Sequence, residues 1–279
     1  MFGNKLFCEI NPTCFKISLQ KEIMKRHIKN MVSDKNIAKT KDTNKFPNLV
    51  SSKSSKLIKK GKGIDPVLQE NKAVNIELAC KKLNGVVIHP GETFSFWKTL
   101  GNTTKRKGYK EGRVIRGNKM VPGTGGGLCN LGNTIHNLVL LSPLDVTEFH
   151  SHSDALAPDD GKRVPFSSGT SVCYNCQDYR FKNNTNQDVQ LLLWCEDGKL
   201  NGELRSEKEF PNVYRIVEEN HHFQKEGEKY YRVSQIYKET LDKQTGEVLD
   251  KNIVLNNHSE VMFDYSQIPQ DQIKEETQV

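Results

Sequence analysis

Apolar residues recur at helical spacing in two stretches of the chain. The first stretch spans residues 72–84, and its apolar face is formed by Ile76, Ala79, Cys80 and Leu83. The second begins at residue 128, with apolar positions at Leu128, Leu131, Ile135, Leu138 and Val139. A period near 3.6 residues is typical of a helix with one buried face. We therefore expect one helix over residues 72–84 and another from residue 128 to Ser142-Pro143.

Short apolar runs, alternating or continuous, predict strands in much of the remaining chain. We expect strands at residues 86–88, 92–97, 144–152, 179–182 and 189–194, and a further strand that runs from the turn at Asp197-Gly198 through Leu204. We also expect a hairpin between residues 98 and 120. From residue 211 onward, turn residues separate runs at 213–217, 230–237, 253–255 and 261–265, which is typical of hairpins. Early helices and late antiparallel strands predict an α+β fold. In it, a Gly-rich loop and a helix pack on a mixed or antiparallel sheet, followed by C-terminal β-hairpins.

The positive charge of the chain lies near its N-terminus. The net charge is +7 over 279 residues, yet residues 1–63 alone hold 15 Lys and Arg against 4 Asp and Glu. Residues 31–63 are polar and rich in Lys and Ser, which is typical of a loop or linker. Such a basic segment either touches an anionic membrane face or nucleic acid without specificity, or is simply solvated. Few aromatic residues interleave with its lysines, so we expect no specific nucleic-acid partner.

These patterns divide the chain into four parts. We expect a partly ordered basic arm at 1–63, a core domain at 64–206, a hairpin region at 207–268 and a flexible tail at 269–279. No apolar run approaches the roughly 18 residues needed to cross a bilayer, so we expect no transmembrane segment. The apolar run at Leu6-Phe7-Cys8 is too short for a signal peptide, which predicts a cytoplasmic protein with mostly reduced cysteines. The oligomeric state stays open.

The strongest candidate for chemistry is the run from Pro122 through Gly125, Gly126 and Gly127 to Cys129. It delivers the cysteine to the first turn of the second predicted helix, where backbone N–H groups and the helix dipole favour anions. A thiol there is expected to lose its proton more easily, and the thiolate is a nucleophile. The glycines would also let a substrate approach the backbone closely. Alternatively, the glycines allow tight packing and the cysteine is a small core residue.

A nucleophilic cysteine needs a base, usually histidine. His136 lies roughly 10 Å along the helix from Cys129, too far for direct contact, but it shares a face with Cys129 and Asn133 and would line the same cleft. His150 and His152 are better placed, on one side of the strand that follows. Asp154, Asp159 and Asp160 are the nearby acids, and we expect Asp159 or Asp160 to orient the imidazole. Each histidine can equally be a surface or hydrogen-bonded residue.

Three further cysteines leave two interpretations open. Cys173 and Cys176 form a single CxxC, and Cys195 follows on a predicted strand. A structural zinc site usually needs four ligands, so we expect no metal here and favour strand cysteines over a zinc site or a redox pair. No Lys-Ser/Thr follows the last glycine of the glycine run, which excludes a phosphate-binding P-loop, and we expect no cofactor.

Three segments resemble the VanW-like family, named after an accessory protein of B-type vancomycin-resistance clusters. They are the run from Glu70-Asn71-Lys72 to Leu83-Asn84-Gly85, the run PGETFSFW at Pro90–Trp97, and Val121-Pro122-Gly123 with GGGLCN at Gly125–Asn130. The resemblance covers about residues 65–206 and is nearest to the short form without a signal peptide. It implies an association with the cell wall and glycopeptide resistance, for a family whose biochemical activity is unsettled. Members of the family also commonly carry a histidine at the position of His152, so the resemblance implies a role for this residue. The chain departs from the family at Asn130, where glutamine is common, and at Arg163, where aspartate is common.

Two main hypotheses about function follow. In the first, the protein is an enzyme that performs cysteine-dependent acyl transfer or amide hydrolysis on a peptide or cell-wall precursor. Cys129 is then the nucleophile and His152 the base, while N–H groups near Gly127 and Asn130 hold the oxyanion. In the second, the protein is a binding module that holds a carboxylate or peptide without chemistry. The residues expected to bind the ligand in either case are Gly125, Gly126, Gly127, Asn130, Asn133, His136 and Trp97. A third possibility is a structural partner protein that acts through its basic arm.

Overall fold

A computed structural model describes residues 7–33, 36–58, 65–116, 119–151, 154–155, 158, 169–174 and 176–275. The core is a four-stranded antiparallel sheet in the order β1 (Asn48–Lys56), β10 (Lys199–Ser206), β9 (Val189–Glu196) and β2 (Val86–Ile88). Two helices pack on this sheet, α3 (Pro66–Leu83) and α5 (Leu128–Leu140). Their apolar faces and the inner face of the sheet form one buried cluster. The α+β class predicted from the sequence is confirmed.

Helix α3 is longer than the sequence pattern suggested. It begins at Pro66, six residues before the predicted start, because the carboxylate of Asp65 accepts hydrogen bonds from the backbone N–H groups of Val67 and Leu68. A capping aspartate followed by proline is a strong helix start. The start falls in a stretch where the apolar period is weak, so periodicity alone places it too late.

A second sheet of three strands lies beside the core in the order β3 (Thr93–Ser95), β8 (Arg180–Lys182) and β6 (Asp145–Glu148). The strands expected at 92–97 and 144–152 are both too long. After Ser95 the chain turns into the short helix α4 (Phe96–Leu100), because the Ser95 hydroxyl accepts a hydrogen bond from the backbone N–H of Lys98. Strand β6 ends at Glu148, so His150 does not lie on a regular strand.

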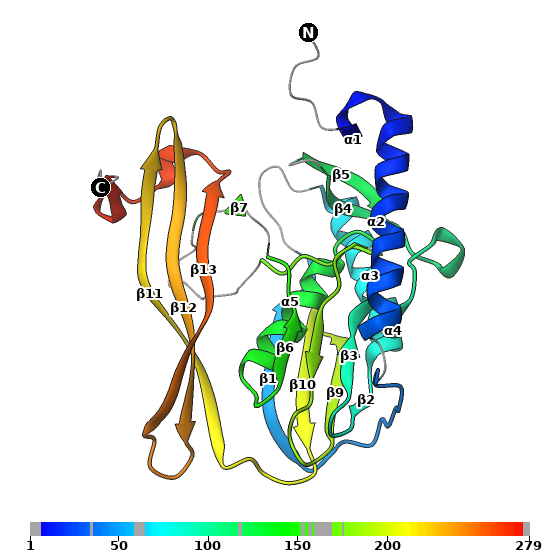
Figure 1. Ribbon diagram of the computed structural model, residues 1–279, viewed down its shortest axis with the longest axis vertical. Coiled ribbons are helices and arrows are strands. Elements are labelled where there is room, and N and C mark those ends of the chain that lie inside the picture. The colour runs from blue at the N-terminus through cyan, green and yellow to red at the C-terminus, as the bar shows by residue number, and fades with distance from the viewer. Residues whose placement is uncertain are drawn as a thin grey trace.

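A hairpin leads into the glycine run. Its strands are β4 (Glu111–Arg116) and β5 (Lys119–Thr124), preceded by the short 3₁₀ helix η1 (Lys105–Lys107). The hairpin packs on α3 and brings the chain back to the N-terminus of α5. Figure 1 shows β4 and β5 above α3.

The C-terminal part forms a separate sheet with much longer strands than expected. Its order is β14 (Ile273–Glu275), β11 (Asn212–Glu226), β12 (Lys229–Asp242), β13 (Val248–Val261) and β7 (Asp154–Ala155). Figure 1 shows this sheet standing beside the core, joined to it by the chain after β10. A smaller apolar cluster holds it together. The last 3₁₀ helices, η2 (Tyr265–Gln267) and η3 (Gln270–Gln272), lead to β14, which pairs with β11 inside the segment expected to be a flexible tail.

The N-terminal segment contributes two helices and one strand of the described structure. After α1 (Phe7–Ile10), the 22-residue helix α2 (Pro12–Ser33) runs along the side of the core away from the C-terminal sheet (Figure 1). The loop expected across residues 31–63 is wrong at β1, which pairs along its length with β10. Its serine-rich sequence hides the strand, yet Ser51 is buried and its hydroxyl donates a 2.8 Å hydrogen bond to the carbonyl oxygen of Leu138 in α5. Among the described residues, no helix is long and apolar enough to span a membrane.

Candidate functional site

The glycine run is packed tightly against its own chain. Gly127 has a left-handed backbone (φ +93°), and a Cβ built there would lie 2.1 Å from Cγ of Lys72. A Cβ on Gly126 would lie 2.2 Å from the carbonyl carbon of Gly112 in β4, and one on Gly125 would lie 2.4 Å from the hydroxyl oxygen of Thr103. Real Cβ atoms do not approach so closely, so the missing side chains make room for α3 and the hairpin. The space that we expected for a substrate is, at these three Cβ positions, taken by the protein itself.

A buried asparagine of α3 fixes the run in place. The side-chain amide of Asn75 donates hydrogen bonds to the carbonyl oxygens of Lys110 (3.0 Å) and Gly126 (2.9 Å). Its oxygen accepts a third hydrogen bond, from the backbone N–H of Lys110 at 2.8 Å. Asn75 is fully buried, so these bonds replace all contact with water. Sequence reasoning missed this residue, although an asparagine next to Ile76 on the apolar face of a helix is a usable signal.

Cys129 lies in the first turn of α5, as predicted, with Gly127 as the cap residue. Its side chain is half-buried, and its thiol donates a hydrogen bond to the carbonyl oxygen of Val172, with S···O 3.7 Å. Burial is the main influence on this group and raises the pKa of the Cys129 thiol. This direction is opposite to the more acidic thiol that we expect from the position at the helix terminus, because burial outweighs the backbone hydrogen bonds that lower the pKa.

The expected oxyanion hole is only partly available. The backbone N–H of Asn130 donates to the carbonyl oxygen of Gly127 at 3.1 Å, so one of the two donors we named is already used. The N–H groups of Gly125 and Gly126 are also bonded within the chain, to Lys110 and Gly123. Any anion at this helix terminus would have to bind to other donors.

The face of α5 that carries Cys129, Asn133 and His136 meets the segment from Thr170 to Tyr179. The Thr170 hydroxyl donates to the side-chain oxygen of Asn133 at 2.9 Å, and Nδ1 of His136 lies 3.1 Å from the hydroxyl of Tyr179. The His136 ring also stacks on Phe149, with ring centroids 4.2 Å apart. Burial lowers the pKa of His136 to about 3, which keeps the ring neutral near pH 7. His136 shares the helix face with Cys129 as predicted, but as a buried, neutral ring.

Of the four residues expected to assist Cys129, one is described. His152, Asp159 and Asp160 lie outside the described residues, as does Arg163. His150 is described: its Nε2 lies 3.0 Å from a carboxylate oxygen of Glu148, and its carbonyl oxygen accepts a 2.7 Å hydrogen bond from the N–H of Ser171. Ser151 then pairs with Thr170. The chain at His150–Ser151 and the thiol of Cys129 therefore flank the same short segment, residues 170–172.

Next to this segment lies a cluster of buried charges that sequence reasoning did not find. Arg26 of α2 contacts Glu148 of β6 and, at 3.1 Å, Asp178; Arg180 of β8 lies 2.7 Å from Asp178. Burial would raise the pKa of Glu148, but hydrogen bonds from Arg26 and His150 outweigh it and lower the pKa to about 2. The members are far apart in sequence and follow no local pattern, so only the folded chain reveals them.

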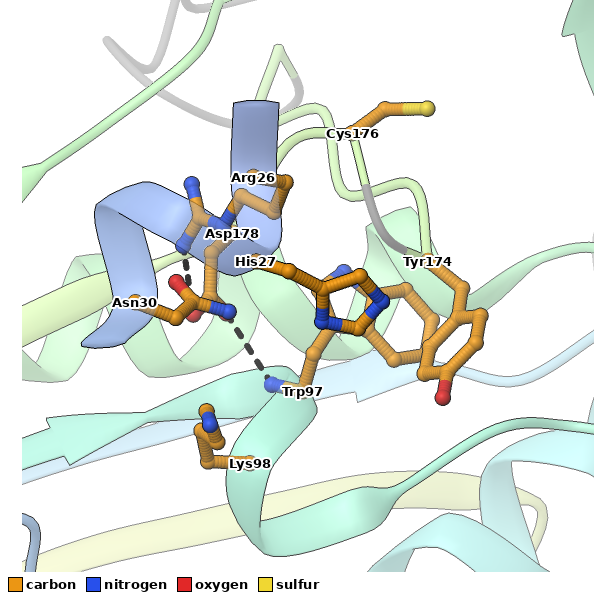
Figure 2. Close-up of a pocket in the computed structure, with 8 residues that line it drawn as sticks. All are labelled: Arg26, His27, Asn30, Trp97, Lys98, Tyr174, Cys176 and Asp178. Atoms are coloured by element: carbon orange, nitrogen blue, oxygen red, sulfur yellow. Dashed lines mark hydrogen bonds and ion pairs between the residues drawn. The ribbon is translucent and has the colours of Figure 1, made fainter. Parts of the chain in front are cut away.

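A small pocket of about 110 Å³ opens beside this cluster, between α2, α4 and the turn before β8 (Figure 2). Trp97 forms one wall: its indole N–H donates to the carbonyl oxygen of Gln177 at 2.8 Å, and its ring meets Tyr174 edge-on at 5.5 Å. Asp178 accepts from the backbone N–H of Trp97 at 3.0 Å. Trp97, which we expected near the glycines, instead belongs to this pocket. The lining residues are Arg26, His27, Asn30, Trp97, Lys98, Tyr174, Cys176 and Asp178.

Four further cysteines form two pairs. Cys173 and Cys176 are hydrogen-bonded within one turn, while Cys195 of β9 is hydrogen-bonded to Cys80 of α3. Cys195 is thus not a third ligand beside the CxxC. The part of the chain that the structure describes holds no group of three or more His, Cys, Asp or Glu suited to a metal ion.

Comparisons with known proteins agree with the resemblance seen in the sequence. Residues 71–205 match the model of the family described as VanW like protein. The chain is 26% identical to the vancomycin B-type resistance protein VanW of Enterococcus faecalis over 218 residues, which cover 78% of this chain and 79% of that protein. It is 32% identical to the uncharacterized protein YoaR of Bacillus subtilis over 122 residues, 44% of this chain and 39% of that protein. No solved structure matches the chain significantly.

Proposed function

Because the chain belongs to the VanW-like family through residues 71–205, we propose that it acts on a peptide or cell-wall precursor by cysteine-dependent acyl transfer or amide hydrolysis. Cys129 is the nucleophile in this proposal and His152 the base, with Asp159 or Asp160 orienting the imidazole. The similarity to a vancomycin resistance protein supports the choice of substrate class, and the geometry around Cys129 supports the choice of nucleophile.

The observation that carries the proposal is the shared border of Cys129 and the His150 segment. The thiol contacts the carbonyl oxygen of Val172, and the N–H of Ser171 binds the carbonyl oxygen of His150. Two residues further along the chain is His152. Cys129 and His150, which are distant in sequence, thus both border residues 171–172, and this supports the choice of a base from the segment that follows His150.

The raised pKa of Cys129 sets a condition for this chemistry. A buried thiol that donates to a carbonyl is protonated at pH 7 and reacts slowly. Acyl transfer then needs a base that removes the proton as the substrate binds. We expect the rate to depend on His152 and to rise with pH.

The test is trapping of an acyl-enzyme with an activated peptide p-nitrophenyl ester, followed by mass spectrometry of the tryptic fragments. We expect one acyl group on Cys129, no acylation in Cys129→Ala, and a rate at least about a hundredfold lower in His152→Ala, the loss typical of a missing general base. Cys80, which is buried where Cys129 is half-buried, is the internal control for unspecific labelling. Acylation that spares Cys129, or that is unchanged in His152→Ala, contradicts the proposal.

A second candidate function is binding without chemistry, and the pocket at Trp97 favours it. The pocket combines an aromatic wall with Arg26, His27 and Lys98, a set of groups that suits a peptide carboxylate. Titration with N-acetyl-alanyl-alanine, followed by isothermal titration calorimetry, tests it. Binding should be lost in Trp97→Leu and kept in both Cys129→Ala and Trp194→Leu, since Trp194 lies on β9 of the core sheet. A titration in which Trp97→Leu binds as well as the parent excludes the pocket.

A further inference from the structure

The turn that carries Cys173 and Cys176 has the backbone of a tight loop. The carbonyl oxygen of Cys173 accepts hydrogen bonds from the N–H groups of Cys176 (3.0 Å) and Gln177 (2.9 Å), and the N–H of Cys173 donates to the carbonyl oxygen of Gln177 (2.9 Å). A bond between residues i and i+3 brings their Cα atoms within about 7 Å. This upper limit lies close to the upper end of the Cα–Cα separations that a disulfide bridges, roughly 4.4–6.8 Å.

The two thiols differ in exposure and in acidity. Cys173 is exposed, whereas Cys176 is half-buried at the edge of the pocket in Figure 2. The thiol of Cys173 hydrogen-bonds to the sulfur of Cys176, which lowers the pKa of Cys176 to about 7; burial and Glu22 oppose this effect, and Arg26 adds to it. A sizeable fraction of Cys176 is therefore thiolate at neutral pH, next to a solvent-exposed second thiol.

We propose that Cys173 and Cys176 form a dithiol–disulfide couple that exchanges electrons with a small-molecule disulfide. The hydrogen-bonded turn, the meeting of the two sulfurs and the exposure of Cys173 point to this site. It does not depend on the chemistry proposed for Cys129.

Both steps of the exchange can be written for these two residues. The thiolate of Cys176 attacks one sulfur of the small disulfide, forms a mixed disulfide and releases one thiolate. Cys173 then gives its proton to water, and its sulfur attacks the sulfur of Cys176, which breaks the mixed disulfide and releases the second thiolate. The pair loses two electrons in forming the Cys173–Cys176 bond, and the small disulfide gains them.

The second thiol pair of the chain shows what distinguishes this site. Cys80 and Cys195 are also hydrogen-bonded, but Cys80 is buried in the core, and both its hydrogen bond to Cys195 and its burial raise its pKa. A disulfide reagent from solvent cannot easily reach a protonated thiol in the core. Cys80 is therefore the built-in control for oxidation at Cys173 and Cys176, whereas Cys195 is half-buried and its hydrogen bond with Cys80 lowers its pKa.

The experiment is to equilibrate the full chain with mixtures of reduced and oxidised glutathione at pH 7, trap free thiols with acid and an alkylating agent, and digest with trypsin. The fragment 164–180 contains Cys173 and Cys176 and no other cysteine. We expect this fragment to lose two hydrogen atoms as the glutathione ratio becomes more oxidising, before Cys80 changes. Fluorescence of Trp97 reports the same transition, since its ring meets Tyr174 inside the turn.

Single variants separate the two roles. Cys173→Ser should stop the reaction at a mixed disulfide between Cys176 and glutathione, because no second thiol resolves it. Cys176→Ser should slow oxidation at this fragment at least about tenfold, since the more acidic thiol attacks first. Cys129→Ala should leave both behaviours unchanged. A fragment that keeps two free thiols in oxidised glutathione, or a Cys173→Ser protein that gathers no mixed disulfide, overturns the proposal.

Discussion

The guanidinium of Arg26 lies 3.1 Å from the carboxylate of Asp178, which follows it 152 residues later in the chain. Arg26 also pairs with Glu148, and all three side chains are at most 8% exposed. Two carboxylates therefore share the cation that docks α2. Removal of Arg26 leaves both carboxylates buried. The guanidinium of Arg180 then remains near them.

Arg26→Ala should undock α2 and lower stability by about 3–5 kcal/mol, the loss typical of a buried pair that is broken from one side. The measurement is the free energy of unfolding in urea, together with limited trypsin digestion at the lysines of α2. Lys25→Ala is the matched control, since Lys25 is exposed and its ion pair among the described residues is with Glu22, one turn earlier on the same helix. Equal effects of the two variants would show that Arg26 does not hold α2.

Protonation of His136 should make the protein less stable in mild acid. Its pKa in the fold is about 3, against an ordinary value of 6.5, because burial disfavours the charged ring. The unfolded chain thus binds a proton that the fold rejects, and stability is lost as the pH falls from 6.5 towards 3. Glu148 adds its own loss only below 4.5, its ordinary pKa. The free energy of unfolding between pH 6.5 and 4.5 should therefore flatten in His136→Gln, and an unchanged slope would refute the assignment.

Gly127→Ala should cost more than its backbone conformation alone explains. Gly127 and Gly91 both have left-handed backbones, with φ of +93° and +81°, but a Cβ at Gly91 meets no atom within 4 Å. Gly91→Ala measures the conformational cost, about 1–2 kcal/mol. Gly127→Ala should add a further 1–3 kcal/mol or so from the collision with Lys72. Urea unfolding of both variants gives the difference, and a difference near zero would mean that Lys72 moves aside freely.

Asn75→Ala should destabilise the hairpin and the glycine run together. The substitution leaves the carbonyl oxygen of Gly126 and the N–H of Lys110 without their partner, at about 1–3 kcal/mol for each buried group. The carbonyl oxygen of Lys110 loses one of its two hydrogen bonds and keeps the one from the N–H of Gly125. Asn71→Ala is the comparison, because Asn71 makes one exposed hydrogen bond, to the carbonyl oxygen of Glu111. Hydrogen exchange of the amides in β4 and β5 should accelerate in Asn75→Ala and stay near the parent rate in Asn71→Ala.

The elements with one strong apolar period were predictable, and those held by scattered polar contacts were not. Helix α5 begins at Leu128 as its periodic leucines indicated, and Val86–Ile88 is a strand as expected. Strand β1 was not predicted because six of its nine residues are serine or lysine, and its place in the sheet comes from pairing with β10. The full length of β13 was not predicted, because polar residues separate its apolar runs and only the run at 253–255 was recognised as a strand within it.

The site divides in the same way. The position of Cys129 on a helix follows from local sequence, but its acidity depends on burial, which involves Val172 far along the chain. The pocket at Trp97 forms where α2 and the turn at Tyr174 meet. Neither segment carries a sequence pattern that predicts its contact with the other. The roles of His152, Asp159 and Asp160 and the cytoplasmic location stay predictions.

The short stretch from Thr170 to Asp178 serves several neighbours at once. Val172 holds the thiol of Cys129, Cys173 faces Cys176, and Asp178 anchors both Arg26 and the backbone of Trp97. Substitutions within this stretch should consequently show epistasis. Their effects on the free energy of unfolding will not be additive, because each substitution shifts a backbone on which the other contacts depend. Substitutions that are each destabilising in this stretch can therefore be tolerated in combination. A library that varies one position at a time will underestimate the number of sequences that fold.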